Sequence, residues 1–263
     1  MSKIIIASSV DASYFQKYHD DWSRSVSKNK SDEMSHALFT IDFQISGNYF
    51  NINSTPIQRS SLKFSEQSSS KSNVESRKRK RFICLETGEF VNFSDLNDDD
   101  ILILTDYDVT MQRPMTEEEI FKLNLLGEKD FAMNRDDYSG SHNLLWFFDK
   151  FCLNSEICQD IDESWVQYNT GVQAGRISAW KNIFSIWKSN AEIVLNSIPQ
   201  HFAFQLFFSY TIQKNNILKE MPVTFHNANW FRDTPAKIKN NQLFVDNDLV
   251  LFFHHKFKTR PGF

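Results

Sequence analysis

The sequence predicts a single α/β domain built around a mostly parallel β-sheet. With 263 residues, of which 41% are hydrophobic and 14% aromatic, the chain is long enough to bury one large core. Residues 101–104, Ile-Leu-Ile-Leu, have no polar alternation, which is typical of a strand buried on both faces of a parallel sheet. Lys3 to Ser9 form a second apolar run, and it leads into an amphipathic helical pattern.

The first part of the chain is expected to contain two strands and one helix. After the first strand, a helix begins near Val10, with Asp11 or Ser13 as its N-cap. Its apolar face is formed by Tyr14, Tyr18, Trp22 and Val26. A second strand is expected from Ala37 to Ile45.

A polar and basic segment separates these elements from the central strand. Serine dominates from Ser60 to Ser76, and Arg77 to Arg81 are five consecutive basic residues. Such a run occurs in nuclear targeting and in nucleic-acid or phosphate contacts, and most often on a solvated surface. We expect a mobile segment around 60–81, from which Arg81 either supplies a positive charge to a diphosphate or stays a surface residue. The net charge of −4 gives no general case for nucleic-acid binding.

Two carboxylates, Asp106 and Asp108, follow the central strand directly. Residues two apart in an extended chain point the same way, and ligands of open α/β sheets bind beyond the carboxyl ends of the strands. A hard divalent cation takes oxygen ligands and often shares its shell with substrate phosphates. The pair is therefore a candidate site for a metal that carries a diphosphate. A short acidic motif of this kind also occurs as a solvated turn.

Arg113 has two interpretations, because it follows the acidic pair closely. It either pairs with those carboxylates as a structural ion pair or binds a substrate. Just beyond it, Thr116 and Glu119 have the spacing of a capping box, which predicts a helix through about Leu126.

The second half of the chain is expected to alternate helices with short strands. Apolar faces predict three helices, over 143–151, 177–194 and 200–213. Apolar runs predict three short strands, over 129–133, 221–225 and 243–245. The stretch 166–172, Val-Gln-Tyr-Asn-Thr-Gly-Val, is a strand or turn in which Gly171 marks a close approach of the backbone to another group. Asn227 to Trp230 form a loop.

The chain closes with an apolar strand that begins at Asp248 and ends in His254, His255, Lys256 and Lys258. Imidazole suits a metal ion, and the ammonium groups suit phosphates. Adjacent residues of a strand face opposite ways, so only one of the two histidines reaches the ion easily. The sequence leaves open which one.

The order of these motifs resembles a glycosyltransferase of the nucleotide-diphospho-sugar transferase (GT-A) fold. The matching motifs are DDILILTDYD, then QYNTGV, a helical Gln-His segment, and a terminal FFHHKFK. The resemblance spans essentially the whole chain. It implies a single Rossmann-like GT-A domain over 1–263, with a mixed, mostly parallel sheet flanked by helices. Residues 1–110 would form the nucleotide-binding half and 111–263 the acceptor-binding half.

The resemblance also implies roles for particular residues. The metal ligands would be Asp106, Asp108 and one of His254 and His255. The nucleoside would meet Ala7, Ser8 and Asp11 at the end of the first strand, and the diphosphate would meet Lys256 and Lys258. The sugar and acceptor side would be lined by Asn169 and Gly171. Apart from the resemblance, Arg113, Asn227 and Trp230 are further candidates for substrate binding. Many relatives carry an Asp or Glu near the start of the helix after the Asn-x-Gly unit. Here the nearest candidates for that group are Gln200 and His201, and Asn169 is a separate candidate catalytic residue.

The implied reaction transfers a sugar from a UDP- or GDP-sugar to an acceptor hydroxyl, with Mn²⁺ or alternatively Mg²⁺ as cofactor. The expected acceptor is a surface glycan or a lipid-linked glycan, without nucleic acid as a partner. Three alternatives stay open: a nucleotidyltransferase, an inactive sugar-nucleotide binder, and a nucleic-acid or lipid-binding module that uses the basic run. The sequence does not predict an oligomeric state or distinguish inversion from retention.

The cysteines and the amino terminus bear on localisation. Cys84, Cys152 and Cys158 show no paired short spacing, which argues against a disulfide framework or a zinc site and suits a reducing compartment. The apolar opening, Lys3 to Ala7, is too short for a signal-peptide core or a membrane span. We expect a cytoplasmic protein with at most peripheral association with the inner face of the membrane.

Overall fold

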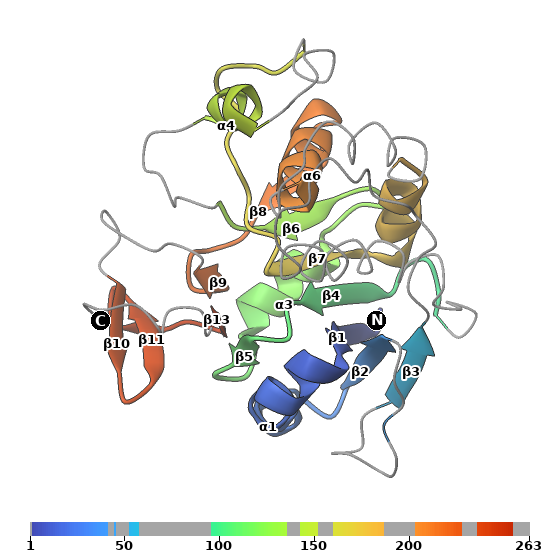
Figure 1. Ribbon diagram of the computed structural model, residues 1–263. Coiled ribbons are helices and arrows are strands. Elements are labelled where there is room, and N and C mark those ends of the chain that lie inside the picture. The colour runs from blue at the N-terminus through green and yellow to red at the C-terminus, as the bar shows by residue number, and fades with distance from the viewer. Residues whose placement is uncertain are drawn as a thin grey trace.

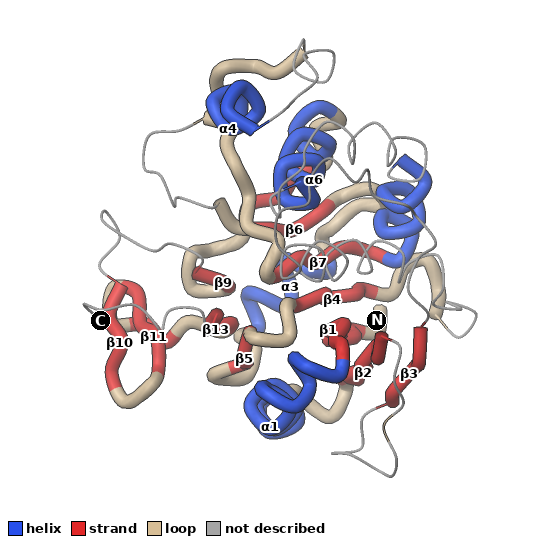
Figure 2. Tube along the Cα trace, viewed as in Figure 1, coloured by secondary structure: helices blue, strands red, loops and turns tan. Residues whose placement is uncertain are grey.

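The chain forms a three-layer α/β fold with helices on both faces of a central sheet (Figure 1). The computed structural model describes residues 2–41, 45, 53–57, 96–135, 143–151, 160–186, 203–227 and 236–254. Within these ranges there are one seven-stranded sheet and two three-stranded sheets. Figure 2 shows how the helices and strands are distributed along the same trace.

The central sheet has the strand order β3-β2-β1-β4-β7-β6-β8. Its strands are β1 Ile4–Asp11, β2 Met34–Ile41, β3 Asn53–Ile57, β4 Ile101–Thr105, β6 Phe131–Met133, β7 Val172–Arg176 and β8 Leu218–Glu220. Among these strands, β7 alone runs antiparallel to its neighbours, β4 and β6. The expected mixed, mostly parallel sheet is confirmed.

The strand directions bring several chain segments to one edge of the sheet. The parallel strands β1, β4, β6 and β8 all end there. Because β7 runs the other way, it begins at this edge, just after Gly171. Chain segments near 105, 134, 171 and 221 therefore meet at the edge where open α/β sheets bind their ligands.

Both faces of the sheet are covered, as the uninterrupted apolar strand predicted. Ile101 and Ile103 pack on the side of α1 (Ala12–Asn29) and α3 (Glu117–Asn124), where Trp22 is fully buried. Leu102 and Leu104 pack on the opposite side, against α4 (Leu144–Phe151), the helical residues 177–186 and α6 (Ala203–Lys214). Each buried side chain of this size stabilises the fold by about 1.5–3 kcal/mol.

The predicted start of α3 is confirmed by its capping box. Thr116 Oγ1 accepts from the Glu119 N–H at 3.2 Å, and a Glu119 carboxylate oxygen accepts from the Thr116 N–H at 2.8 Å. These reciprocal bonds satisfy two N–H groups that have no partner within the helix.

The expected closing strand is instead two strands in two different sheets. β12 (Asp248–Leu249) joins β11 (Gln242–Val245) and β10 (Ala236–Lys239). β13 (Phe252–His254) lies between β5 (Val109–Met111) and β9 (His226–Asn227). Between them, Val250 and Leu251 are both fully buried, and their N–H groups bond to Leu243 O and Thr224 O. The apolar run from Leu249 to Phe253 has no polar break because the chain stays inside the protein where it crosses from one sheet to the other.

The strand expected at 221–225 is absent, and a strand that was not expected forms at 172–176. Residues 221–225 form a turn between β8 and β9, where the Phe225 N–H donates to Pro222 O. Pro222 has no N–H for a sheet ladder, which favours a turn here. Conversely, 172–176 form β7, an interior strand of the sheet, although Gln173 and Gly175 interrupt any apolar pattern. Packing against β4 and β6 overrides the weak local propensity.

Several predicted segments lie outside the described residues. These are the polar and basic segment at 60–81, the end of the helix after 186, and residues 228–230 of the expected loop, whose first residue, Asn227, lies in β9 instead. Among the described residues, no helix is long and apolar enough to cross a lipid bilayer.

Candidate metal centre

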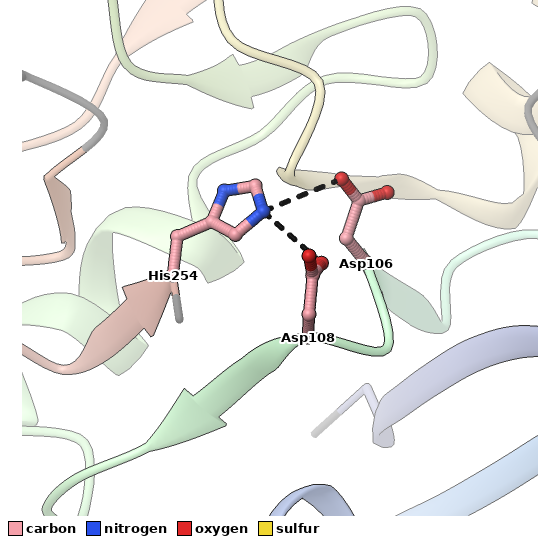
Figure 3. Close-up of side chains that lie close together, drawn as sticks. All are labelled: Asp106, Asp108 and His254. Atoms are coloured by element: carbon pink, nitrogen blue, oxygen red, sulfur yellow. Dashed lines mark hydrogen bonds and ion pairs between the residues drawn. The ribbon is translucent and has the colours of Figure 1, made fainter. Parts of the chain in front are cut away.

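Asp106, Asp108 and His254 converge at the ligand-binding edge of the sheet. One ligand atom of each lies within 4.8 Å of the others. His254 Nε2 is 3.0 Å from Asp108 Oδ1 and 3.8 Å from Asp106 Oδ2 (Figure 3). The two halves of the predicted site therefore meet, although 146 residues separate Asp108 from His254. His255 lies outside the described residues.

The two aspartates converge through a turn and not along an extended strand as expected. β4 ends at Thr105, and the Val109 N–H then donates to Asp106 O at 3.1 Å. Tyr107, between the aspartates, is buried against Trp22 and Phe15 of α1, with ring centroids 5.6 and 6.2 Å away. The buried ring holds the turn to α1 while both carboxylates lie beside His254.

Gly171 lies directly against the triad, as predicted for a close approach of the backbone. Its carbonyl accepts from the Asp106 N–H at 2.8 Å, and its own N–H donates to Asn169 Oδ1 at 2.7 Å. A Cβ at position 171 would lie 2.7 Å from Asn169 Oδ1 and 3.0 Å from His254 Nδ1. The turn thus contacts the triad on two sides, and no larger residue fits without a shift.

His254 is placed by β13, which pairs with β5 so that His254 lies opposite Val109, the residue after Asp108. The side chains of His254 and Asp108 are 6% and 3% exposed, whereas that of Asp106 is 24% exposed. Two carboxylates close together in a largely buried site are unfavourable without a compensating positive charge. Two carboxylates and one imidazole fit a divalent cation that accepts oxygen and nitrogen ligands.

The turn at 168–171 is anchored by a polar cluster that the sequence did not predict. The Tyr168 hydroxyl and Arg135 Nε donate to the same Glu220 oxygen at 2.7 and 2.9 Å. Burial and the neighbouring Glu220 carboxylate raise the pKa of Tyr168. Partial burial alone would raise the pKa of Glu220, but hydrogen bonds from Tyr168 and Arg135 outweigh it and hold that pKa below its usual value.

His226 is a second histidine beside the triad that sequence reasoning missed. It lies in β9, and its ring centroid is 6.4 Å from that of His254. Burial, with a smaller effect of His254, lowers the pKa of His226 to about 3, so its imidazole is neutral at neutral pH. The only sequence signal was a lone histidine after an apolar run.

Arg113 is a structural residue in this fold. Its guanidinium forms a bidentate ion pair with Glu119, at 2.7 and 2.8 Å. Its remaining N–H groups donate to the carbonyls of Leu249, Pro114 and Thr224. Arg113 therefore forms a structural ion pair, but its partner is Glu119 and not the acidic pair that was expected. The whole donor set is used within the protein, which leaves no donor for a substrate.

The other predicted site residues are placed less completely. Ala7 and Ser8 are fully buried, and Ser8 Oγ donates to Thr105 O, so this hydroxyl joins β1 to β4. Asp11 ends β1 at the ligand-binding edge, and Asn227 lies in β9 beside β13. The remaining predicted residues lie outside the described part of the chain: Arg81, Gln200, His201, Trp230, Lys256 and Lys258.

Comparisons with known proteins identify the fold. No protein-family model matches the sequence, and a search of curated proteins found no significant match. The apo form of mouse xyloside xylosyltransferase 1 matches with a TM-score of 0.54 and 12% identity, over 85% of this chain and 86% of that one. The galactosyltransferase LgtC, in complex with donor and acceptor sugar analogues, matches with a TM-score of 0.48 and 14% identity, over 84% and 74% of the two chains.

Proposed function

We propose that this chain, which has the GT-A fold, is a metal-dependent glycosyltransferase. The observation that carries the proposal is the convergence of Asp106, Asp108 and His254 at the carboxyl-end edge of the sheet. The substrate would be a nucleoside diphosphate sugar, UDP- or GDP-linked, and the acceptor would be a hydroxyl group of a growing glycan.

The three side chains would hold Mn²⁺, with Mg²⁺ as the alternative. Mg²⁺ favours an all-oxygen octahedral shell that keeps several waters, whereas a set of two carboxylates and one imidazole suits Mn²⁺ better. When bound, the cation would offset the negative charge that develops on the leaving diphosphate. Asp106 and Asp108 would fix its place, and the turn at Gly171 would keep His254 oriented towards it.

The reaction breaks the bond between the anomeric carbon and the diphosphate oxygen and forms a bond from that carbon to the acceptor oxygen. The acceptor hydroxyl loses its proton, and the nucleoside diphosphate leaves. Asn169, whose side chain caps the Gly171 N–H beside the triad, is the described residue that we place nearest to the sugar. His201 is the proposed proton acceptor, and Gln200, whose amide can only hydrogen-bond, would orient the acceptor hydroxyl. Lys256, Lys258 and Arg81 are the proposed diphosphate contacts. Asp11, at the end of β1, would line the nucleoside, whereas Ala7 and Ser8 are fully buried in the sheet and would support that end of β1 without contacting the ligand.

Turnover of sugar nucleotides tests this proposal. Purified protein is incubated with a panel of UDP- and GDP-sugars, with Mn²⁺ or with a chelator, and release of the nucleoside diphosphate is measured. Release should require the metal and fall at least about 100-fold in Asp106→Asn, because charge stabilisation by a bound metal contributes several kcal/mol. Asp98→Asn, an exposed aspartate paired with Lys181, removes an equal charge elsewhere and should have no effect.

Two outcomes would overturn the proposal. Metal-independent turnover that survives Asp106→Asn would remove the metal centre from the reaction. Release of pyrophosphate from a nucleoside triphosphate, with no consumption of sugar nucleotides, would identify a nucleotidyltransferase instead.

A further inference from the structure

His226 is a buried polar side chain whose ring nitrogens have no hydrogen-bond partner among the residues that the structure describes. It is 1% exposed. A neutral imidazole carries one N–H donor and one acceptor nitrogen, so both capacities are unused. Buried polar groups are almost always paired, and an unpaired one points to a water, an ion or a ligand that supplies the partner.

The position of His226 indicates which group that partner is. β9 and β13 are parallel neighbours, and His226 lies opposite Phe252, two residues before His254. Side chains two apart share one face of a strand, so His226 and His254 are diagonal neighbours on the same face of this small sheet. Their ring centroids, 6.4 Å apart, are too distant for a hydrogen bond between the rings.

The small sheet therefore carries a row of three polar groups. Asp108 immediately precedes β5, His254 lies on the central strand β13, and His226 lies on β9. His254 Nε2 contacts Asp108, on the β5 side. His226 flanks His254 on the other side, where no described residue pairs with it.

We propose that His226 hydrogen-bonds an oxygen atom in the coordination shell of the metal, which is a water or a phosphate oxygen of the donor. The inference rests on the proposed function, because it requires that Asp106, Asp108 and His254 hold the cation. His226 is then a positioning residue for the shell and not a metal ligand, which agrees with its absence from the group of converging ligand atoms. Residues beyond the direct ligands typically change metal affinity 10- to 100-fold when they are mutated.

The test compares His226→Phe with wild type by calorimetric titration, first with Mn²⁺ alone and then with UDP in the presence of Mn²⁺. Phe keeps the ring volume and removes both nitrogens. If the partner is a metal-bound water, the affinity for Mn²⁺ alone falls about 10- to 100-fold. If it is a phosphate oxygen, only the Mn²⁺-dependent affinity for UDP falls by that factor. Both results support the proposal.

Control variants separate this role from a structural one. Thermal unfolding of metal-free His226→Phe should occur at the wild-type temperature or above it, because the variant removes two unpaired buried polar atoms. His226→Gln keeps a donor and an acceptor and should retain most of the affinity. His36→Phe alters another buried histidine, near the start of β2 and so towards the opposite edge of the sheet, and should leave both affinities unchanged. His226→Leu replaces His226→Phe in every titration if the Phe variant does not fold.

Unchanged affinities in folded His226→Phe and His226→Leu, with wild type binding both Mn²⁺ and UDP, would overturn the inference and leave the proposed function standing. A metal-free protein that is destabilised by His226→Phe, with metal affinity intact, would assign His226 a structural role. Failure of wild type to bind Mn²⁺ in any combination would instead contradict the proposed function itself.

Discussion

The two small sheets differ in how they are built and in what they carry. β10, β11 and β12 come from a single stretch, 236–249, joined by tight turns, and Lys237 and Lys239 are exposed. β5, β13 and β9 come from segments around 110, 253 and 226, and β13 is buried along its whole length. The first sheet is local and exposes one edge strand, β10, while Leu243 and Val245 of β11 are buried. The second sheet is non-local and carries the candidate metal centre.

The difference teaches that the site depends on contacts between distant segments. Gln112 and Arg113, just after β5, connect the two sheets. Gln112 exchanges hydrogen bonds with the backbone of Leu243 and donates to Val250 O, and Arg113 donates to Leu249 O. The local sheet thus fixes where the chain turns inward towards β13 and His254.

The largest loss of stability should follow from truncating a buried side chain of the non-local sheet. Phe252 in β13 is 1% exposed and packs edge-on against Phe225 at 5.4 Å. Phe252→Ala should lower the free energy of unfolding by about 3–5 kcal/mol, measured by urea denaturation. Ile238→Ala in β10, which is only partly buried, should cost about 1 kcal/mol or less. Equal losses would mean that the two sheets do not differ in burial as described.

The second largest loss of stability should come from breaking the connection between the two small sheets at Arg113. Arg113→Ala leaves the buried Glu119 carboxylate without its partner and should cost about 3 kcal/mol of unfolding free energy. Arg113→Lys keeps the charge but loses the bidentate geometry, so it should fall between wild type and Arg113→Ala. Neither folded variant should change the affinity for UDP with Mn²⁺. A specific loss of UDP affinity in Arg113→Lys would restore the substrate-binding interpretation.

Gly171 tests the contact between the central sheet and the non-local small sheet. Gly171→Ala places a Cβ 3.0 Å from His254 Nδ1 and 2.7 Å from Asn169 Oδ1, so it should cost about 1–3 kcal/mol and weaken Mn²⁺ binding. Gly127→Ala is the matched control, since its Cβ meets only the flexible end of Asp130 at 3.1 Å. The prediction fails if both variants bind Mn²⁺ equally well.

The smallest loss of stability is expected at Glu220, the half-exposed carboxylate that binds Tyr168 and Arg135 behind the 168–171 turn. The pKa of Glu220 is lower in the folded protein than its usual 4.5, so its contribution to stability is complete above that pH and is lost as the pH falls through the folded value. Because Glu220 is half-exposed, Glu220→Gln should cost less than about 1 kcal/mol at pH 7. Thermal unfolding at pH 7 and pH 3 should show the difference from wild type shrinking at the acidic pH. A constant difference would assign the loss to packing.

The sequence predicted the local parts of this molecule well and the non-local parts poorly. The strand at 101–104, the α3 capping box and the acidic pair depend on residues within a few positions of one another. β7 could not be predicted because Gln173 and Gly175 gain their strand conformation from β4 and β6. The break at Val250 and Leu251 was hidden because a continuous apolar run looks the same in one buried strand and in a crossing between sheets.

In the candidate metal centre, too, the residues set by local sequence were predictable and those set by non-local contacts were not. Asp106 and Asp108 were predictable from the strand before them, and His254 from the apolar run before it, but no pattern distinguished His254 from His255. His226 could not be predicted because its importance comes only from its register with β13. Arg113 was ambiguous because its choice of Glu119 over the acidic pair depends on the folded position of α3.

The central claim is that Asp106, Asp108 and His254 form a metal centre for a nucleoside diphosphate. Calorimetric titration of UDP and GDP, with and without Mn²⁺, into wild type and Asp108→Ala tests it most directly. We expect wild type to bind one of the nucleotides only with Mn²⁺, and Asp108→Ala to lose at least about 10-fold in that affinity. Metal-dependent binding of equal strength in both proteins would contradict the account.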